Sequence, residues 1–401
     1  MTQTAFADLF DPAAKSNPYP IYADLRTSRP VHHVMLPDGS RLWLITRYDD
    51  AAHALRDPRL IKGRTIRPVP EDLAPFTKSM LSTDPPDHTR LRGLVHQAFT
   101  PRLIERLRPR IQQIADELLD RVEPVGAMDL VEDYAFPLPM TVITELLGVP
   151  SQDRDRFREW SNTFVSSGFA SQDEPFPEPL RASMTAFSDY LRALFEHKRA
   201  DPRDDLVSRL VLAEQQDGAR CDALSETELI GMVFLLIVAG HETTVNLIGN
   251  AVLALLTHPD QLRRLIEDPA LIVPAVEELL RYDGPVEIAT FRFASVDIEL
   301  GGVRIPQGDP VLVALASADR DEARFADADR LDITRADNRH LAFGKGIHFC
   351  LGAPLARLEG QIAIGTLLRR MPGLRSAVPL DQLEWRPSTI LRGLRSFPIV
   401  F

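Results

Sequence analysis

The stretch from Phe343 to Gly352 contains the residues best suited to chemistry. Cys350, one of two cysteines in the 401-residue chain, lies between a glycine-rich turn and a run with helical periodicity. A thiol at a helix N-terminus meets unpaired N–H groups and a partial positive charge, which favour the thiolate. Gly344 and Gly346 carry no Cβ and let the backbone approach a large flat group. These features predict a metal-binding thiolate. The alternative is a buried structural cysteine, a common role of a lone Cys.

A second group of polar residues interrupts the longest apolar run, Leu229 to Thr257. Near its middle, Glu242 is preceded by His241 and followed by Thr243. A membrane span is disfavoured, because charged side chains at bilayer depth are costly. We expect a long helix buried on nearly all sides, in which an ionisable side chain in an apolar setting is usually functional. The alternative is a structural acid that is paired, with the hydroxyl bonded to its own helix.

Other charged residues stand in patterns that are ambiguous on their own. His88 and Arg92 are four residues apart on a predicted helix and would share one face. Glu278 and Arg281 are three residues apart on another helix, and Arg292 follows an apolar stretch. Charged residues are mostly exposed, and exposed pairs contribute under about 1 kcal/mol, so each could be a solvated surface group.

The thiol stretch resembles the haem-binding loop of the cytochrome P450 family, Phe-x-x-Gly-x-x-x-Cys-x-Gly, with Phe343, Gly346, Cys350 and Gly352 in register. Three further family patterns occur in order: Asp-Pro-Pro-x-His-x-Arg-x-Arg at 84–92, Ala-Gly-x-Glu/Asp-Thr at 239–243 and Glu-x-x-Arg at 278–281. The resemblance covers nearly the whole chain. One departure is His241, which replaces a residue that is often small or apolar; its ring could affect proton delivery or substrate orientation, or point away.

The resemblance implies a role for each of these residues. Cys350 would be the thiolate ligand of the iron in haem b (iron protoporphyrin IX), and Glu242 and Thr243 would relay protons to bound dioxygen. The remaining haem-binding residues would be His88, Arg92, Arg292 and His348, on the two propionates, with Phe343, Gly344 and Ala239. Glu278, Arg281 and Arg330 would form a buried structural network.

The implied activity is that of a haem-thiolate monooxygenase, which hydroxylates or epoxidises a lipophilic small molecule in secondary or xenobiotic metabolism. One alternative is a peroxide-driven peroxygenase, against which the Glu242–Thr243 pair argues, since such an enzyme needs no proton relay. Another is a non-catalytic haem sensor, although no output domain is left over. A zinc site of Cys350, His348 and His340 lacks a second cysteine or a close ligand pair.

The resemblance also implies that electrons come from NAD(P)H through a ferredoxin or flavodoxin and its reductase. An acidic partner of this kind would dock on basic residues near the cysteine. The candidates are Arg102, Arg106, Arg108, Arg110, Lys345 and Arg357. The alternative is that these arginines form an ordinary solvated helix face.

Composition limits the class of protein further. Hydrophobic residues make up 44% and charged residues 26%, as in ordinary globular proteins. A net charge of −11 argues against nonspecific nucleic-acid binding. The two cysteines, Cys221 and Cys350, exclude a disulfide framework and suit a reducing cytoplasm. The first residues show no signal peptide and no membrane anchor, so we expect a cytoplasmic, bacterial type of enzyme.

The elements that must position these residues give a fold that is mainly α with small β-sheets, with the long central helix over the haem. We expect one domain, 1–401, with β-rich parts at about 30–47, 296–316 and 388–401 and a helical remainder. Strands are predicted at 31–36, 41–46 and 311–316, with a hairpin at 296–305. Helices are predicted at 21–28, 49–56, 84–99, 103–122, 134–147, 153–165, 182–199, 204–214, 229–257, 273–282 and 351–371, and 225–228 has the pattern of a capping box.

By the same resemblance, four mostly apolar segments would line the substrate site. They are 67–76, 164–169, 286–290 and 390–394. Their composition predicts a lipophilic substrate such as a polyketide, terpene, steroid or fatty acid, and Arg67 could meet a carboxylate or face solvent.

Overall fold

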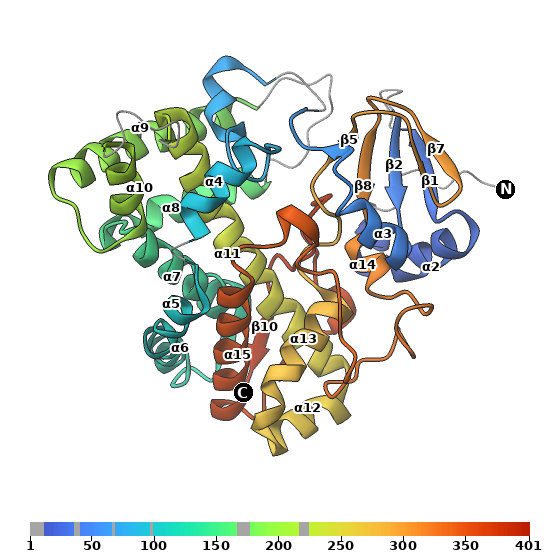
Figure 1. The fold of residues 1–401 in the computed structure, drawn as a ribbon. Helices are drawn as coiled ribbons and strands as arrows, with labels where there is room; N and C mark the ends of the chain where they lie inside the picture. Colours follow the sequence, from blue (N-terminus) through green and yellow to red (C-terminus); the bar gives the residue numbers. More distant parts are fainter. Residues whose placement is uncertain (1–11, 36–40, 66–68, 97–98, 167–176, 216–223) are drawn as a thin grey trace. The chain divides into compact units, whose positions relative to one another are not determined.

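The computed structural model describes residues 12–35, 41–65, 69–96, 99–166, 177–215 and 224–401 (Figure 1). The chain forms two compact units. Unit 1 comprises Met1–Leu60, Glu105–Leu138 and Thr243–Phe401, and unit 2 comprises Ile61–Ile104 and Pro139–Glu242. The expectation of a single domain stays a prediction.

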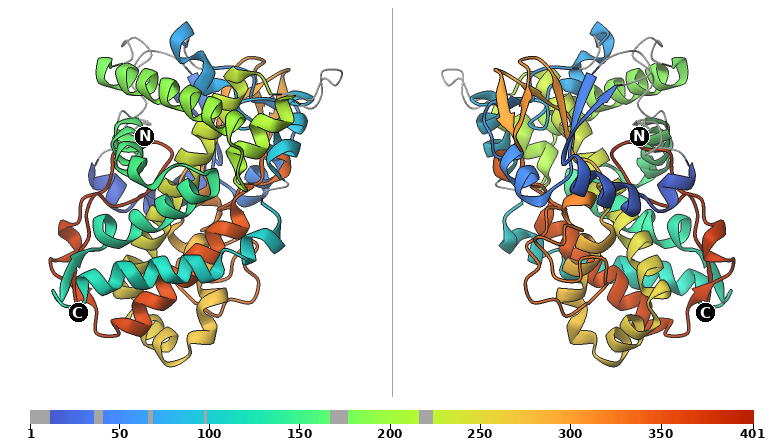
Figure 2. Two further views of the ribbon diagram at one scale, coloured as in Figure 1. Left: turned by 90° about the vertical axis from the view of Figure 1, so that its left-hand side faces the viewer. Right: turned by 90° about the vertical axis from the view of Figure 1, so that its right-hand side faces the viewer.

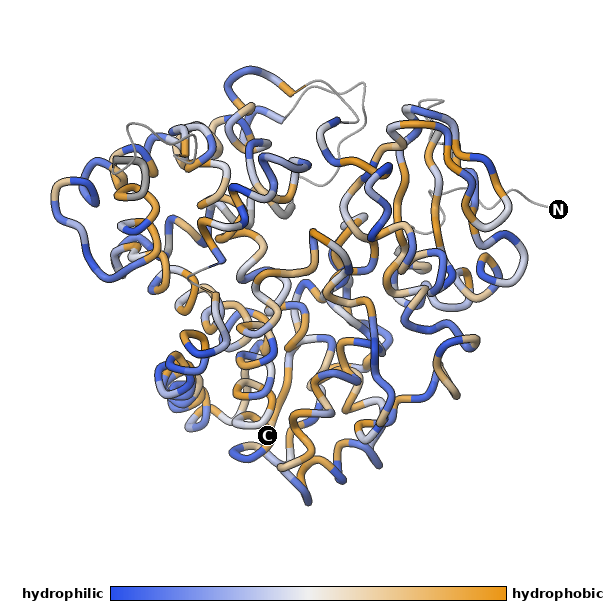
Figure 3. The backbone as a smooth tube through the Cα atoms, in the orientation of Figure 1, coloured by the Kyte–Doolittle hydropathy of each residue, from blue (hydrophilic) through white to orange (hydrophobic). Residues whose placement is uncertain are grey.

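The described part of unit 1 contains three small sheets, in agreement with the expected mainly α fold with small β-sheets. The largest has the strand order β1 (Val31–Met35), β2 (Arg41–Ile45), β8 (Pro310–Val313), β5 (Arg292–Ala294) and β3 (Leu60–Ile61). The strands β1 and β2 pair antiparallel, β2 and β8 pair parallel, and β8 and β5 pair antiparallel. Apolar residues recur along these strands (Figure 3) and are buried in two core clusters. This sheet therefore fixes the position of Arg292, the first residue of β5.

The other two sheets are shorter. The predicted hairpin consists of β6 (Ile298–Leu300) and β7 (Val303–Ile305), joined by Gly301 and Gly302 at φ +59° and +77°. The third sheet has the order β4 (Ala127–Asp129), β10 (Pro398–Val400) and β9 (Arg375–Ser376). The C-terminal segment 388–401 is thus regular strand only at β10.

The helix α15 (Ala353–Arg370) begins just after the cysteine loop. It lies beside α6 (Arg108–Val122) and α13 (Ile272–Asp283) (Figures 1 and 2). A Cβ on Gly360 would lie 3.1 Å from the Leu247 side chain of α11 (Glu226–Thr257), so α15 and α11 approach closely there. The remaining helices of this unit are α1 (Pro12–Ser16), α2 (Tyr19–Ser28), α3 (Tyr48–Ala54), α12 (Pro259–Glu267) and α14 (Leu315–Ala318).

Unit 2 is helical in its described part. It contains α4 (Asp87–His96), α8 (Arg154–Ser166), α9 (Glu178–Ala200), α10 (Leu206–Gln215), the short 3₁₀ helix η2 (Glu71–Thr77), the first half of α11 and most of α7 (Pro137–Leu147). Aromatic rings join several of these elements: the centroids of Phe157 and Phe187 are 5.6 Å apart, and those of Phe76 and Phe234 are 4.9 Å apart. The predicted capping box is confirmed, because Ser225 and Glu228 exchange hydrogen bonds at the start of α11.

Some helix boundaries differ from the sequence predictions. The predicted helix 103–122 is broken into α5 (Pro101–Glu105) and α6, which has Pro109 in its first turn. The Asp84 carboxylate does not cap α4; it accepts the backbone N–H groups of Lys62 and Gly63. The helix α11 is long and apolar enough to cross a membrane, but 61% of its most apolar window is buried inside the protein, as expected for a core helix.

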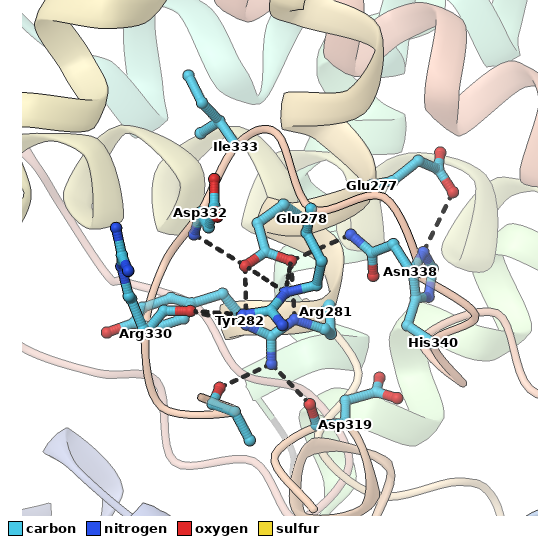
Figure 4. A network of polar contacts seen from close by, with 12 residues as sticks. Glu277, Glu278, Arg281, Tyr282, Asp319, Arg330, Asp332, Ile333, Asn338 and His340 are labelled. Atoms are coloured by element: carbon cyan, nitrogen blue, oxygen red, sulfur yellow. Dashed lines mark hydrogen bonds and ion pairs between the residues drawn. The ribbon is translucent and has the colours of Figure 1, made fainter. Parts of the chain in front are cut away.

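A buried ionic network ties α13 to the loop that precedes the cysteine (Figure 4). Arg281 donates to both carboxylate oxygens of Glu278 at 2.8 Å. Its remaining N–H groups donate to the backbone oxygens of Asp319, Ala328 and Arg330. The segment 319–330 is therefore fixed on one fully buried guanidinium.

The third charged side chain of this network is Arg335 and not, as predicted, Arg330. Arg335 Nε lies 3.1 Å from each oxygen of Glu278, whereas Arg330 contributes only its backbone carbonyl and is exposed. The spacing of residues along a loop does not show which arginine turns inward.

This difference can be tested by stability. We expect Arg335→Ala to lower the free energy of unfolding by about 3–5 kcal/mol, because it leaves a buried carboxylate with less compensation. The matched control, Arg330→Ala, keeps the backbone carbonyl. It should change the free energy of unfolding by less than about 0.5 kcal/mol. Denaturant unfolding of the two variants measures both values, and equal losses would contradict the assignment.

Candidate active site

The loop 341–352 holds Cys350 by backbone hydrogen bonds. The N–H of Cys350 donates to the Phe343 carbonyl at 2.9 Å, and the N–H of Gly344 donates to the Leu341 carbonyl at 2.7 Å. Gly346 has φ +76°, and a Cβ there would lie 2.6 Å from the Leu55 carbonyl oxygen, so the position requires glycine. The loop ends at Gly352, and α15 begins at Ala353 with Pro354 in its first turn.

The cysteine itself is exposed, so the alternative of a buried structural cysteine is wrong. Its neighbours Ile347 and Phe349 are 50% and 39% exposed, which is unusual for large apolar side chains. An exposed thiol near a helix N-terminus, surrounded by uncovered apolar groups, suits a large apolar ligand that carries a metal.

The set of possible metal ligands also fits haem. In the described ranges no three His, Cys, Asp or Glu side chains are grouped to hold a bare metal ion. A single cysteine thiolate is one of the protein ligands by which haem iron is held. The zinc alternative is not supported, because His340 has its Nε2 3.2 Å from Glu277 and its Nδ1 3.2 Å from the N–H of Ala342.

The loop is braced from α13 and α15 by a second ion pair. Arg357 donates to both oxygens of Glu277, at 2.6 and 2.9 Å, and its guanidinium lies 4.5 Å from the Phe343 ring centroid. Burial alone would raise the pKa of Glu277, but the hydrogen bonds from His340 and Arg357 outweigh it and lower that pKa to about 2. Arg357 is thus partly neutralised, which weakens it as a docking residue.

The helix α11 carries the predicted acid and hydroxyl. Glu242 is buried, and its Oε2 lies 3.8 Å from His241 Nε2. His241 does not point away into solvent: its Nδ1 lies 2.6 Å from the Ile237 carbonyl one turn earlier. Ala239 is exposed and Thr243 half-buried, four residues apart on one face of the helix.

A further buried acid was missed by sequence reasoning. Thr244 donates to Glu359 Oε2 at 3.1 Å, which links α11 to α15, while Glu359 Oε1 is buried with no hydrogen-bond partner among the described residues. Burial raises the pKa of Glu359 to about 8 against the lowering effect of the Thr244 hydrogen bond. A signal existed, since Glu359 interrupts the apolar face of a predicted helix.

The other predicted site residues lie in both units. In unit 1, His348 is half-buried in the same loop as Cys350, and Arg292 is buried in β5 with its Nη1 3.3 Å from the Thr290 carbonyl. In unit 2, His88 is buried and Arg92 half-buried, both on α4.

Two of the predicted substrate-lining segments are brought together within unit 1. The N–H of Glu287 donates to the Ile390 carbonyl at 2.8 Å, and the N–H of Arg392 donates to the Pro285 carbonyl at 2.9 Å. In unit 2, Phe164 contacts the rings of Phe187 and Phe234. Arg67 and 167–169 lie outside the described residues, as does Cys221.

A mainly helical fold with an exposed thiol before a helix N-terminus is typical of haem-thiolate proteins. The family model described as Cytochrome P450 matches residues 26–275 and 270–372. The chain is 49% identical to vitamin D(3) 25-hydroxylase of Pseudonocardia autotrophica, over 99% of this chain and 97% of that protein. It is also 49% identical to the cytochrome P450 monooxygenase PikC of Streptomyces venezuelae, over 96% and 91% of the two chains.

Among solved structures, a myxobacterial cytochrome P450, CYP267B1, in complex with myristic acid superposes with a TM-score of 0.92 at 46% identity, over 99% of both chains. The chain therefore belongs to the cytochrome P450 family. It is a haem-dependent monooxygenase that inserts one oxygen atom of dioxygen into a lipophilic small molecule by hydroxylation or epoxidation.

The buried carboxyl of Glu359 gives a prediction about pH. Because its folded-state pKa, about 8, lies above the ordinary value of 4.5, the folded protein binds this proton more tightly than the unfolded chain. The stability it contributes is complete below the unfolded pKa and is lost as pH rises through the folded pKa. Glu359→Gln, which cannot ionise, should flatten this fall.

Denaturant midpoints measured between about pH 5 and pH 9 test this prediction. The control is Glu322→Gln, which changes an exposed acid in the same unit and should keep the parental profile. If Glu359→Gln keeps the parental profile too, the carboxyl of Glu359 is not the group that titrates.

Proposed function

We propose that the Cys350 thiolate is the protein ligand of the haem iron. The observation that carries this proposal is the exposed thiol of Cys350, three residues before α15 begins, in a residue whose backbone N–H donates to the Phe343 carbonyl. Haem, when bound, supplies the activation of dioxygen, and an anionic sulfur ligand favours cleavage of the O–O bond. The positive end of the α15 dipole, next to Cys350, favours the anionic form of the sulfur.

The propionate carboxylates of the haem need positive partners, because a buried charge without one is costly. We assign this role to His88, Arg92, Arg292 and His348. Arg292 supports the assignment best, since its guanidinium is a buried positive charge at the start of β5, with Nη1 3.3 Å from the Thr290 carbonyl. Phe343, Gly344 and Ala239 would lie against the ring.

Glu242 and Thr243 would move protons toward the dioxygen. A proton on a Glu242 carboxyl oxygen passes, directly or through water, to the Thr243 hydroxyl, which presents it on the less buried face of α11. The imidazole of His241 lies next to this acid, with its Nε2 3.8 Å from Glu242 Oε2. His241 thus belongs to the proton-supplying group in this proposal.

The substrate would be a lipophilic molecule such as a polyketide, terpene, steroid or fatty acid, processed in secondary or xenobiotic metabolism. Vitamin D(3) and myristic acid, named with two of the similar proteins, are both molecules of this kind. Apolar residues in 286–290 and 390–394 would supply suitable walls within unit 1.

Electrons would come from NAD(P)H through a ferredoxin or flavodoxin in the cytoplasm. Of the six basic candidates, Arg102 lies in unit 2, and Arg357, Arg108 and Arg110 are paired with Glu277, Glu105 and Glu117, so Arg106 and Lys345 are the stronger candidates in unit 1. A reduction rate that falls as salt rises is the expected sign of such docking, and a rate indifferent to salt would exclude it.

The thiolate assignment predicts an optical result. Cys350→Ser should abolish the red-shifted Soret band of the ferrous carbon monoxide complex, because an alcohol is a far weaker anionic donor than a thiol. Cys221→Ser, which changes the only other cysteine, is the control and should keep the parental spectrum. A parental spectrum in Cys350→Ser would refute the assignment, as would a native protein that binds no haem.

The proton relay predicts a difference between two oxidants. Glu242→Gln should lower turnover driven by NAD(P)H and dioxygen by about 10²-fold, a common contribution of one proton-transfer group. Turnover driven by hydrogen peroxide, which already carries its protons, should change by less than about threefold. The measurement uses a ligand selected by its shift of the Soret band.

The matched control is Glu226→Gln, an exposed acid at the start of the same helix, which should leave both rates unchanged. Equal losses with both oxidants would remove Glu242 from proton delivery. A native enzyme that works with peroxide and never with a reductase would favour the peroxygenase alternative.

A further inference from the structure

The N-terminal segment places a buried cation beneath the two turns 286–290 and 390–394. Lys15, in α1, is 2% exposed, and its ammonium group donates to the Glu287 carboxylate and to the Ser388 carbonyl, the latter at 2.7 Å. The hydroxyl of Tyr22, in α2, donates to the other oxygen of Glu287 at 2.8 Å. Both oxygens of this carboxylate are therefore held by the first described helices of the chain.

The second turn is bound to the same N-terminal segment, but here the donor lies in the turn and the acceptors lie in the segment. The guanidinium of Arg392 donates to the backbone carbonyls of Lys15 and Ser16 and, through Nε, to Asp283 at 2.6 Å. It also stacks on Trp385, with its centre 3.6 Å from the ring centroid. The end of α1 is thus fixed between the two turns.

Regular β-structure holds these turns only weakly. They pair with each other and with the large sheet through isolated bridges, Val286 with Leu391 and Ile288 with Ala314, and through single backbone hydrogen bonds such as that from the Ala289 N–H to the Val313 carbonyl. A turn without a continuous ladder depends in part on side chains for its position. Lys15, Tyr22 and Arg392 supply those side chains. We call these three residues, together with their partners Glu287 and Asp283, the clasp.

The clasp is electrically balanced. Two cations, Lys15 and Arg392, face two anions, Glu287 and Asp283, and all four are buried. Burial lowers the pKa of Lys15, against the raising effect of Glu287. Loss of one member leaves an opposite charge buried without compensation, so the surrounding backbone must move or admit water.

We propose that Lys15 is a positioning residue, which through the clasp sets the shape of the wall formed by the turns 286–290 and 390–394. The consequence for substrate selection rests on the proposed function, in which these turns face the substrate. A lipophilic substrate offers few directional contacts, so the wall determines which carbon is presented for oxidation. The N-terminal segment is then a determinant of regiochemistry, although it lies far in sequence from the residues of the reaction.

The test compares two buried lysines. Lys15→Met removes the clasp cation, and Lys198→Met removes an equally buried lysine that pairs with Asp205 in unit 2. Hydrogen exchange of the haem-loaded protein should become about tenfold faster at the N–H groups of Glu287 and Arg392 in Lys15→Met, which corresponds to about 1.4 kcal/mol. In Lys198→Met these two groups should exchange at the parental rate.

Tyr22→Phe provides a milder variant should Lys15→Met fail to fold, because it removes one hydroxyl and keeps the ion pair. It should accelerate exchange at the same two groups by a smaller factor. The positioning role is overturned if exchange at these groups stays parental in the folded clasp variants, or rises equally in Lys198→Met.

Ligand binding separates this role from the proposed function. Imidazole reports on access to the iron, and 4-phenylimidazole adds an apolar ring that must fit the walls. We expect Lys15→Met to weaken 4-phenylimidazole by about tenfold relative to imidazole, and Lys198→Met to leave the ratio unchanged. Faster exchange with an unchanged ratio would keep the clasp but remove the two turns from the substrate wall. A protein that shows no haem spectrum would refute the proposed function alone.

Discussion

The structure of unit 1 depends on keeping one thiol uncovered and in a fixed place. An exposed side chain has few packing contacts to hold it, so the backbone must do so. The N–H of Cys350 is bonded to the Phe343 carbonyl, and Gly346 lies against the backbone at Leu55. The helix α15 then begins almost at once, so movement of the sulfur would require movement of a helix packed on α6 and α13. The fixed position therefore comes from the loop and not from burial.

Most of the buried charge in unit 1 stabilises irregular backbone. Arg281 donates hydrogen bonds to three backbone carbonyls of the loop that leads to the cysteine. The Glu278 carboxylate accepts hydrogen bonds from Arg281, Arg335 and a backbone N–H. The neighbouring residue Glu277 binds Arg357 of α15 and His340 of the same loop. The backbone N–H and C=O groups of a long loop are not paired with a neighbouring strand. Side chains that have several donors or acceptors bind these groups instead. Such pairs contribute specific geometry more reliably than net stability.

Local patterns in the sequence predicted the elements and the chemistry-bearing residues, since glycine spacing, helical periodicity and the capping box at Ser225 act over a few residues. They did not predict partners chosen across the fold. Whether Arg330 or Arg335 turns inward depends on the path of a loop, and the pairing of Lys15 with Glu287 joins residues 272 positions apart. The sequence prediction also missed the break between α5 and α6 at Leu107. Pro109 indicates where α6 begins, because proline is well tolerated in the first turn of a helix.

The contact between Thr244 and Glu359 joins the two helices next to the proposed reactive groups, the Thr243 hydroxyl on α11 and the Cys350 thiol just before α15. Successive residues of a helix are rotated by about 100°, so if Thr244 faces α15, Thr243 must face another direction. Gly360, next to Glu359, lets Leu247 approach and so fixes the same rotation one turn further along α11. Since α15 also carries Cys350 just before its first turn, the rotation that orients the Thr243 hydroxyl and the position of the sulfur are set by a single helix. A change that loosens the contact between α11 and α15 would therefore alter the geometry between thiol and hydroxyl without touching either group.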